Sequence, residues 1–327
     1  MPMGQAIVDE ATFIETRKNL MSDTATAKAL GMSVQNVTAR ARRLERKHGI
    51  RFLTHDPRRP QYDTSMLVTA DRVEVKLTLR DGVILVSGDQ HFFPNHVPTM
   101  HRAYCLLAKK LKPFACIWNG DAFDGATISR HPSIGWEDKP AVSEELECVK
   151  ERAHEVMKAA PSAKRIWCAG NHDLRFESRI AMYAPEFRNV QGMHLKDHIP
   201  EFLPAWFVTV NGGTESHTEI RHREKGGVHA AYNNTKESGV TLVTGHDHRA
   251  DVVSYDDRRG RRYGVRHGMG ADSSRDAPFV HYLEGRTTNW QSAIAVLTYK
   301  DGMLLMPELA LRVSEDSFQF RGEIIKC

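Results

Sequence analysis

The stretch Ile166-Trp167-Cys168-Ala169-Gly170-Asn171-His172-Asp173 (IWCAGNHD) decides how the rest of the chain is interpreted. Its four apolar residues predict a short buried strand, which Gly170 ends. Three polar side chains follow immediately. They either cap a helix that begins there, since Asn and Asp are good N-caps, or form a site at the carboxyl end of the strand.

Three other predicted strands end in similar polar residues. The stretch ILVSGDQHF ends with Asp89 and His91, CIWNGDAFDG with Asp121 and Asp124, and LVTGHDHRAD with His246 and His248. Each stretch alone has an ordinary explanation as a turn, a cap or a pair of surface histidines. All four, however, follow a glycine at the end of a strand, where α/β sheets place their ligands. Because Asp, Asn and His are ligands of divalent transition metals, the four stretches together predict a metal site.

In this order the motifs D-x-H, G-D-x-x-D, G-N-H-D and G-H-x-H resemble the calcineurin-like metallophosphoesterase superfamily, over roughly residues 84–251. The resemblance implies an α/β fold, a layered αββα sandwich of two mixed β-sheets flanked by helices. It also implies two divalent metal ions, manganese first, with iron, zinc, nickel or cobalt as alternatives. One ion would be held by Asp89, His91, Asp121 and His248, and the other by Asp121, Asn171, His246 and a separate histidine.

The resemblance also assigns roles to the other residues of the motifs. Asp121 bridges the two ions, and Asp124 orients a metal ligand through a hydrogen bond. His172 faces the substrate and stabilises charge or acts as general acid, and Asp173 orients His172. A hydroxide that bridges the two ions then attacks phosphorus.

The separate histidine of the family pattern has three candidates. His222 ends the alternating strand TEIRH, His229 lies inside a predicted helix, and His217 lies in a polar loop. Since every other ligand follows a strand, we choose His222 and keep His229 as the alternative. Arg223 stands where the family often has a glycine after this histidine.

Departures from related patterns narrow the substrate. Gly125 follows Asp124 where Ser/Thr protein phosphatases have a phosphate-binding arginine. Asp124 itself stands where purple acid phosphatases have a tyrosine, and His172 stands where lipid-A pathway hydrolases commonly have an arginine. These departures leave the diesterases of the superfamily, which include nucleases and phage enzymes. The resemblance therefore predicts a phosphodiesterase that acts on nucleic acid. The alternatives are a phosphomonoesterase or cyclic-nucleotide phosphodiesterase and, in another class, a DNA-binding regulator with a structural metal site.

The N-terminal fifth of the chain is basic. Residues 1–65 carry 11 Lys and Arg against 7 Asp and Glu, and therefore hold the whole net charge of +4. Two helices predicted on either side of Gly31 resemble a helix-turn-helix DNA-binding unit through Ala27, Gly31 and Val37. The residues expected to face inward are Ala27, Leu30, Val34, Val37, Ala41 and Leu44.

The nucleic-acid contacts predicted on this unit are Arg40, Arg42, Arg43, Arg46 and Lys47. Arg40 departs from the motif, which usually has an apolar residue there. A small helical cap with a solvated basic face is the alternative interpretation.

The 327 residues are expected to contain a helix-turn-helix-like domain over 1–53, a polar linker over 54–65 and a metallophosphoesterase domain over 66–327. A hydrophobic fraction of 41% and a charged fraction of 26% are those of a soluble globular protein. The sequence has no apolar run of membrane length and no secretion signal. Its 5 cysteines show no paired motif. We therefore expect a cytoplasmic protein, in the host cytoplasm if it is viral, with no membrane partner.

Overall fold

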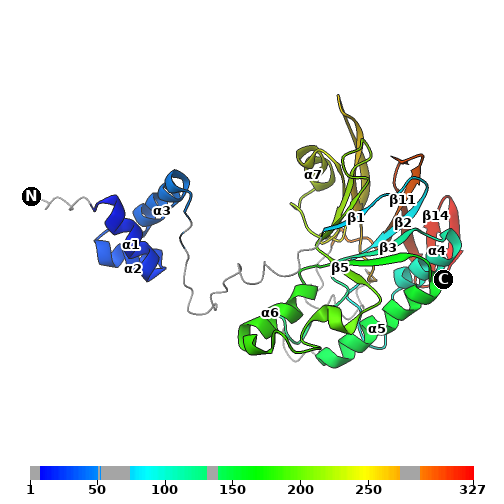
Figure 1. Cartoon of the computed structure of the whole chain (residues 1–327), viewed down its shortest axis with the longest axis horizontal. Coiled ribbons are helices and arrows are strands. Elements are labelled where there is room, and N and C mark those ends of the chain that lie inside the picture. The colour runs from blue at the N-terminus through cyan, green and yellow to red at the C-terminus, as the bar shows by residue number, and fades with distance from the viewer. Residues whose placement is uncertain (1–7, 51, 53–73, 131–138, 273–287) are drawn as a thin grey trace, which may run out of the picture. The chain divides into compact units, whose positions relative to one another are not determined.

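The computed structural model describes residues 8–50, 52, 74–130, 139–272 and 288–327. The chain divides into two compact units, Met1–Met66 and Leu67–Cys327 (Figure 1). Each unit has a hydrophobic core of its own. The linker expected over 54–65 lies outside the described residues.

The smaller unit contains the helices α1 (Glu10–Leu20), α2 (Asp23–Leu30) and α3 (Val34–His48). Each helix begins at a side-chain cap, because Asp9, Ser22 and Ser33 each accept a hydrogen bond from the backbone N–H three residues later. Gly31 ends α2 in the left-handed conformation, with φ of 63°, and turns the chain into α3. The two helices predicted on either side of Gly31 are confirmed as secondary structure.

A small apolar core holds these three helices together. It consists of Phe13, Ala27, Val37, Ala41, Leu44 and Phe52. The expectation that Val34 faces inward is wrong, since Val34 lies in the first turn of α3 and is 44% exposed. Met32 packs against the core at that end of the helix instead.

The basic residues of α3 differ in their surroundings. Arg40 is half-buried, with its guanidinium 4.7 Å from the centre of the Phe13 ring and one N–H donated to the Val8 carbonyl at 2.6 Å. This cation–π contact explains how arginine occupies a position where an apolar residue is usual. Lys47 forms an ion pair with Glu10 at 3.0 Å. Lys47 remains exposed in this pair, and the exposed arginines of the helix are Arg42, Arg43 and Arg46.

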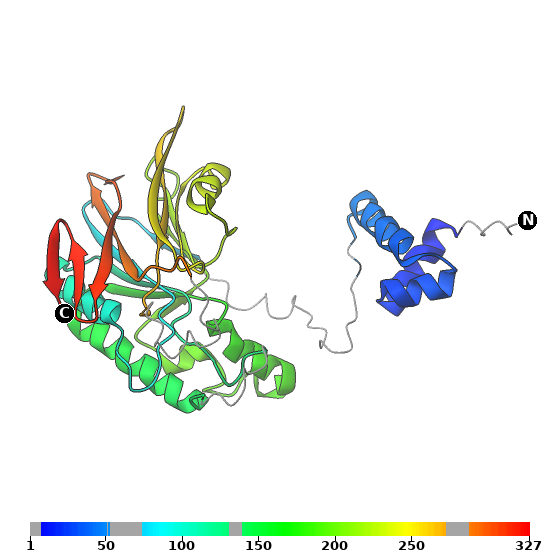
Figure 2. The ribbon, with the colours of Figure 1, turned by 180° about the vertical axis from the view of Figure 1, so that it is seen from behind.

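The larger unit is built on two mixed β-sheets (Figures 1 and 2). In order across the first sheet, the strands are β15 (Glu323–Lys326), β14 (Ser317–Phe320), β13 (Glu308–Ser314), β11 (Ala293–Lys300), β2 (Gly82–Ser87), β3 (Ala115–Asn119), β4 (Lys164–Cys168) and β5 (Leu203–Ala205), with β12 (Met303–Leu304) paired to β11. In order across the second sheet, they are β1 (Glu74–Leu77), β6 (Phe207–Val210), β7 (Thr218–Arg221), β8 (Thr241–Thr244), β10 (Gly260–His267) and β9 (Ala250–Asp257).

Helices cover the outer faces of both sheets. In β2, Ile84 and Val86 pack between the sheets, whereas Leu85 packs on the side of α4 (Thr99–Leu111) and α5 (Val142–Ala159). This alternation follows from the two-residue period of a strand. Helix α7 (Ala230–Ser238) contacts β8, β9 and β10 of the second sheet. The predicted layered α/β sandwich of two mixed sheets flanked by helices is therefore confirmed, as is the helical region that precedes it.

The largely apolar stretch AWFVTV belongs to two sheets. β5 ends at Ala205 and pairs with β4, and β6 begins at Phe207 and pairs with β1 and β7. The alternating pattern runs through both strands because the backbone is extended in each. Only the hydrogen-bonding partners change at Trp206, and a sequence pattern does not specify partners.

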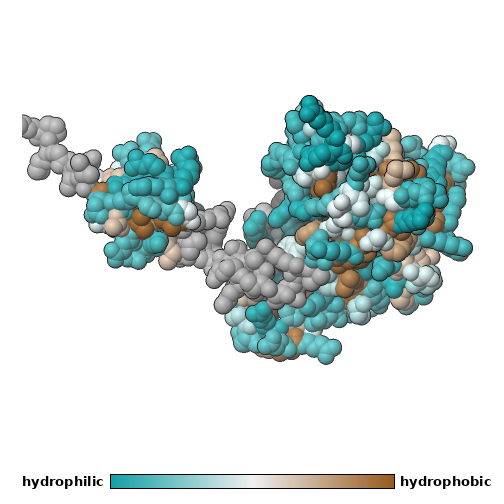
Figure 3. Space-filling model, turned by 45° about the horizontal axis from the view of Figure 1, so that its top comes forward, coloured by the Kyte–Doolittle hydropathy of each residue, from teal (hydrophilic) through white to brown (hydrophobic). Residues whose placement is uncertain are grey.

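The segment after β4 forms α6 (Asp173–Tyr183), followed by the short 3₁₀ helices η1 (Pro185–Phe187) and η2 (Leu195–His198). None of the helices in the described part of the chain is both long and apolar enough to cross a bilayer. The face of each unit seen in Figure 3 is mainly hydrophilic, with smaller apolar areas.

Replacing Phe13 with Ala is expected to unfold the smaller unit alone. Phe13 is fully buried, and loss of such a side chain costs about 3–5 kcal/mol, which a core this small does not tolerate. Calorimetry of the full chain should show one transition lost and the transition of the larger unit unchanged. Leu20→Ala, an exposed position of the same helix, is the matched control. A shift of both transitions in Phe13→Ala would contradict the independence of the two cores.

Candidate metal centre

Every predicted ligand lies in a loop that directly follows a strand. Asp89 and His91 follow β2, Asp121 follows β3, Asn171 follows β4, His222 follows β7, and His246 and His248 follow β8. Strands β2, β3 and β4 are parallel neighbours in one sheet, and β7 and β8 are parallel neighbours in the other. Parallel neighbours end at the same edge, so the loops gather at one end of the sandwich.

Glycines allow these loops to approach one another. A Cβ added to Gly120 would lie 2.3 Å from His222 Nδ1, and one added to Gly170 would lie 2.1 Å from Asp121 Oδ1. A Cβ on Gly245 would lie 2.6 Å from Asp89 Oδ2. Any side chain at these positions would displace a ligand. The glycine that precedes each motif is therefore needed for the contacts between loops, in addition to ending a strand.

The backbone of the loops is strained at the ligands themselves. Asp89, His91, Asp121, His246 and His248 have φ angles between 43° and 72°. This left-handed region is uncommon for residues other than glycine and costs about 1–2 kcal/mol per residue. Strain of this kind concentrates at functional sites.

Asp89, His91 and His248 form the first group of donors, with one donor atom of each within 4.8 Å of the others. Asp89 is fully buried, and its Oδ1 lies 3.2 Å from His248 Nε2. His91 Nδ1 lies 2.9 Å from Asp124 Oδ1. A carboxylate accepts this hydrogen bond, so His91 carries its proton on Nδ1 and presents Nε2 as a metal-ligating atom. Asp124 thus lies where the sequence analysis placed it, one hydrogen bond behind a ligand.

Asp121, His222 and His246 form the second group. His222 Nε2 lies 3.1 Å from Asp121 Oδ2 and 3.3 Å from Asn171 Oδ1. His222 Nδ1 donates to the carbonyl of Asn119 at 2.7 Å, which directs Nε2 toward the other donors. Asp121 also forms a set with His91 and His172. It therefore lies between the two groups, as a bridging ligand must.

The other two candidate histidines lie elsewhere. His229 is the exposed residue that precedes α7. His217 precedes β7, at the opposite end of that strand from His222, with Nε2 3.8 Å from a Glu219 oxygen. The structure places His222 beside Asp121.

Buried negative charge dominates the site. Asp89 and Asp121 are 0% and 1% exposed. Burial raises the pKa of each carboxyl, but His222 and the other neighbouring histidines outweigh it and hold both pKa values well below the usual range. Burial lowers the pKa of His222, and Asp121 and Asp89 raise it in turn to about 10. Such carboxylates need cations beside them, and a set of carboxylate, amide and imidazole donors fits divalent transition metals.

His172 borders both groups, but the residue that orients it differs from the expectation. His172 Nδ1 lies 2.7 Å from Asp124 Oδ1, the same oxygen that binds His91. Asp173 was expected to hold His172, and this role belongs to Asp124. The buried Asp173 carboxylate instead accepts the backbone N–H groups of Gly170, Asp121 and Phe123 and the indole N–H of Trp167, at 2.8–3.1 Å. Asp173 is the first residue of α6, and its side chain binds the backbone of two ligand loops.

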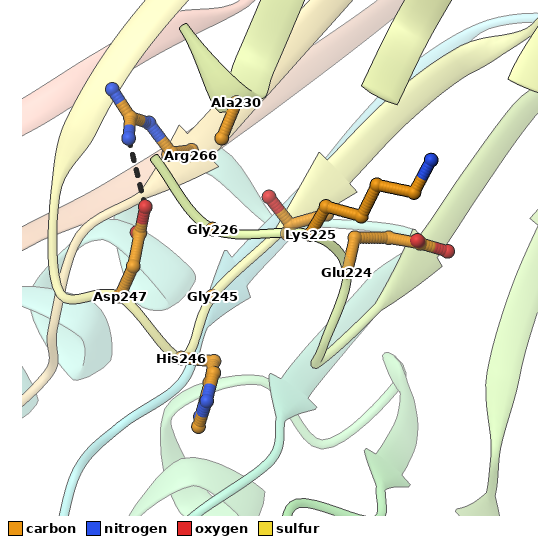
Figure 4. A pocket seen from close by; sticks show the side chains of 9 residues that line it. Glu224, Lys225, Gly226, Ala230, Gly245, His246, Asp247 and Arg266 are labelled. Atoms are coloured by element: carbon orange, nitrogen blue, oxygen red, sulfur yellow. Dashed lines mark hydrogen bonds and ion pairs between the residues drawn. The ribbon is translucent and has the colours of Figure 1, made fainter. Parts of the chain in front are cut away.

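Several residues of the site were not identified from the sequence. Arg175 donates to the Asp124 carbonyl at 2.8 Å and lies 3.1 Å from His172 Nε2. Arg266 pairs with Asp247, in the loop between the last two ligands, at 2.8 Å (Figure 4). His267 is fully buried, with Nε2 3.1 Å from Asn119 Nδ2.

Only Arg175 had a signal in the sequence. It follows His172 by three residues at the start of a helix, a spacing that brings side chains together. Arg266 and His267 lie on β10, a strand that the sequence analysis did not assign.

Comparisons with known proteins give partial matches. No family model matches the chain. The gene 54 protein of Mycobacterium phage L5 is 30% identical over 162 residues, and that of Mycobacterium phage D29 is 29% identical over 150 residues. Both matches cover 43% of this chain and 58% of the relative, so the chain spans little more than half the length of these curated relatives.

Among solved structures, wild-type Vps29 complexed with Zn²⁺ from Entamoeba histolytica is 14% identical, with a TM-score of 0.37, and covers 74% of this chain and 96% of that one. The phosphoesterase Yfce from E. coli is 13% identical, with a TM-score of 0.31, and covers 69% of this chain and 97% of that one.

Separate replacement of His222 and His229 with Ala should identify the ligand. His222→Ala is expected to remove about one metal ion per chain, since a site with fewer than four donors holds its metal weakly. His229→Ala, at an exposed position, should leave the metal content unchanged. Elemental analysis of the protein purified in excess Mn²⁺ measures both. Equal metal content in the two variants would contradict the assignment of His222.

Proposed function

We propose that the chain is a phosphodiesterase that depends on two divalent metal ions and acts on nucleic acid. The observation that supports this proposal is the convergence of two donor groups on one shared carboxylate, Asp121, with His172 beside them. Asp121 would hold one ion together with Asp89, His91 and His248, and the other together with Asn171, His222 and His246. Manganese is the proposed metal, and iron, zinc, nickel or cobalt fit the same donors.

When bound, the ions would polarise the phosphoryl oxygens and supply an activated water. The chain's own residues place the remaining groups. Asp124 Oδ1 binds both His91 and His172, so one carboxylate oxygen fixes a ligand and the neighbouring imidazole together. The His172 side chain is 22% exposed, whereas Asp121 is buried. His172 is thus the accessible group that we propose to stabilise the developing charge or to protonate the leaving oxygen.

The smaller unit supports nucleic acid as the substrate class. Arg42, Arg43 and Arg46 lie exposed on α3, the second helix of the helix-turn-helix-like pair. Contacts between such cations and phosphates supply most of the affinity for nucleic acid that does not depend on sequence. Because the curated relatives are phage proteins, we propose that the protein acts in the host cytoplasm.

Two substitutions should separate metal binding from turnover. Asp121→Asn is expected to abolish turnover and lower metal content, because it weakens the ligand shared by both groups. His172→Ala is expected to lower kcat by about 10²–10⁴-fold, the usual contribution of a general acid, and to retain both metals. Steady-state kinetics on bis(p-nitrophenyl) phosphate and elemental analysis measure the two effects. If His172→Ala loses metal as fully as Asp121→Asn, the proposed role of His172 is wrong.

A substrate panel with the Mn²⁺-loaded protein decides among the functions. The proposal expects turnover of the chromogenic diester and of single- or double-stranded DNA. Faster turnover of p-nitrophenyl phosphate or of a cyclic nucleotide would favour the alternative enzymes. Metal and DNA binding without turnover of any ester would favour a regulator with a structural metal site.

Removal of residues 1–66 should affect DNA and small substrates differently. Every proposed ligand lies in the larger unit, so turnover of the small diester should persist, while the KM for DNA rises because binding contacts are lost.

In the full chain, Arg42→Ala/Arg43→Ala should reduce the slope of log affinity for duplex DNA against log salt by roughly 2, at about 0.9 per phosphate contact. Lys18→Ala/Lys28→Ala removes the same charge from exposed positions of α1 and α2 and is the matched control. Equal DNA binding by all of these proteins, at low and at physiological salt, would reduce the proposal to a phosphodiesterase without assigned substrate.

A further inference from the structure

Arg175 presents a guanidinium at the edge of the metal centre. Its NH2 group lies 3.1 Å from His172 Nε2, and its NH1 group donates to the Asp124 carbonyl at 2.8 Å. The Arg175 side chain is 20% exposed, close to the 22% of His172. The Arg175 and His172 side chains are therefore both partly exposed, and both contact Asp124.

The local backbone makes room for this side chain. Gly125 has a φ of +63°, and a Cβ there would lie 3.3 Å from Arg175 Cβ and 2.9 Å from the Phe123 ring. The buried Glu145 carboxylate accepts the N–H groups of Gly125 and Ala126 at 2.6 Å and 3.0 Å, which holds the turn in place. Arg175 thus lies on a helix that begins directly after a ligand loop. Its guanidinium contacts a turn whose position is fixed by Glu145.

The charge of Arg175 is only partly compensated. Among the described residues, the nearest carboxylate oxygen is Asp124 Oδ1, at 3.9 Å from NH1, which is too long for a hydrogen bond. That oxygen already binds both His91 and His172. The contacts of Arg175 with the Asp124 carbonyl and with His172 Nε2 occupy at most two of the five N–H donors of a guanidinium. Donors and positive charge therefore remain for an anion that reaches the metal centre.

We propose that Arg175 binds a non-bridging phosphoryl oxygen of the substrate and so determines the affinity of the site for phosphoester anions. This inference rests on the proposed phosphoesterase function. A planar guanidinium suits this task because its paired N–H groups match two oxygens of a phosphate. The alternative is that Arg175 only positions His172, through the contact with Nε2.

Binding of inorganic phosphate to the Mn²⁺-loaded full chain, measured by calorimetry, tests the proposal without turnover. Arg175→Ala should raise the Kd for phosphate by roughly 10- to 100-fold, the usual effect of losing a hydrogen bond to a charged group, with metal content unchanged. Arg175→Lys should recover only part of the affinity, because it keeps the charge and loses the paired donors. Arg179→Ala removes the same charge one turn later on α6, where the guanidinium lies over the Tyr183 ring at 4.3 Å, and should bind phosphate as the unaltered chain does.

Combining Arg175→Ala with His172→Ala separates direct binding from positioning. If Arg175 binds the phosphoryl group, Arg175→Ala weakens phosphate binding by a similar factor whether or not His172 is present. The KM for bis(p-nitrophenyl) phosphate should rise in both backgrounds. If the effect disappears in the His172→Ala background, Arg175 acts only through His172 and the proposal is overturned.

The outcomes also separate this inference from the proposed function. A chain that turns over diesters, while Arg175→Ala and Arg175→Lys bind phosphate as tightly as the unaltered chain, refutes the role of Arg175 and leaves the function intact. A chain that turns over no ester but binds phosphate through Arg175 refutes the function, and with it a role toward a substrate, and leaves Arg175 as a phosphate-binding residue only. Thermal unfolding of each variant, with Arg175→Lys as the milder change, shows whether a loss of binding reflects a loss of fold.

Discussion

The buried carboxylate of Asp121 is the group on which the rest of the candidate metal centre depends. Its Oδ1 accepts the backbone N–H of His172 at 2.7 Å, its Oδ2 lies 3.1 Å from His222 Nε2, and its own N–H is held by Asp173. Removal of an ionised carboxylate from water costs several kcal/mol. The charge is tolerated only because imidazoles and N–H groups from both sheets converge on it, which explains why the ligand loops must meet closely and why Gly170 must lack a side chain.

The backbone strain and buried charge of the site lower the free energy of unfolding. Packing in the core between the two sheets compensates for this loss. Five ligands in left-handed conformations cost about 1–2 kcal/mol each, and two buried carboxylates add several more. Packing elsewhere in the fold must offset this cost. Burial of the inner faces of β2, β3 and β4 against β6, β7 and β8 offsets it. The strands that carry the ligands are therefore also the strands that fill the core, and the loops cannot relax without loss of that packing.

The sequence predicted those parts of the protein that depend on local pattern. A glycine followed by Asp, Asn or His after a short apolar run marked the ends of β2, β3, β4 and β8, because close approach and strand termination both leave a signal within a few residues. The alternation of TEIRH likewise marked the strand that ends before His222. The layered fold followed from the family resemblance.

The parts that the sequence did not predict depend on partners distant in the chain. The chain moves from one sheet to the other at Trp206 without any change in the residue pattern, because that pattern does not specify which strands pair. β9 and β10 carry many charged residues, and Arg266 is nonetheless buried because Asp247, 19 residues earlier, pairs with it. Arg40 occupies an apolar position because Phe13, 27 residues earlier, provides a ring for it. In each case, the position of a charged or extended segment depends on a contact with a residue too distant in the sequence for a local pattern to reveal.

Asp124 shows that contacts between residues distant in the sequence also position the groups proposed to carry out the chemistry. One of its oxygens binds both His91 and His172, and its carbonyl accepts from Arg175. A change at Asp124 would therefore disturb a proposed metal ligand, the proposed acid and the proposed phosphate-binding arginine together, so its effect on activity could not be assigned to one of them. His172 and Arg175 each touch Asp124 from the accessible side, whereas His91 is buried behind it. Substitution of the two accessible residues, singly and together, leaves the His91–Asp124 hydrogen bond in place and can separate the binding of the substrate from the binding of the metal.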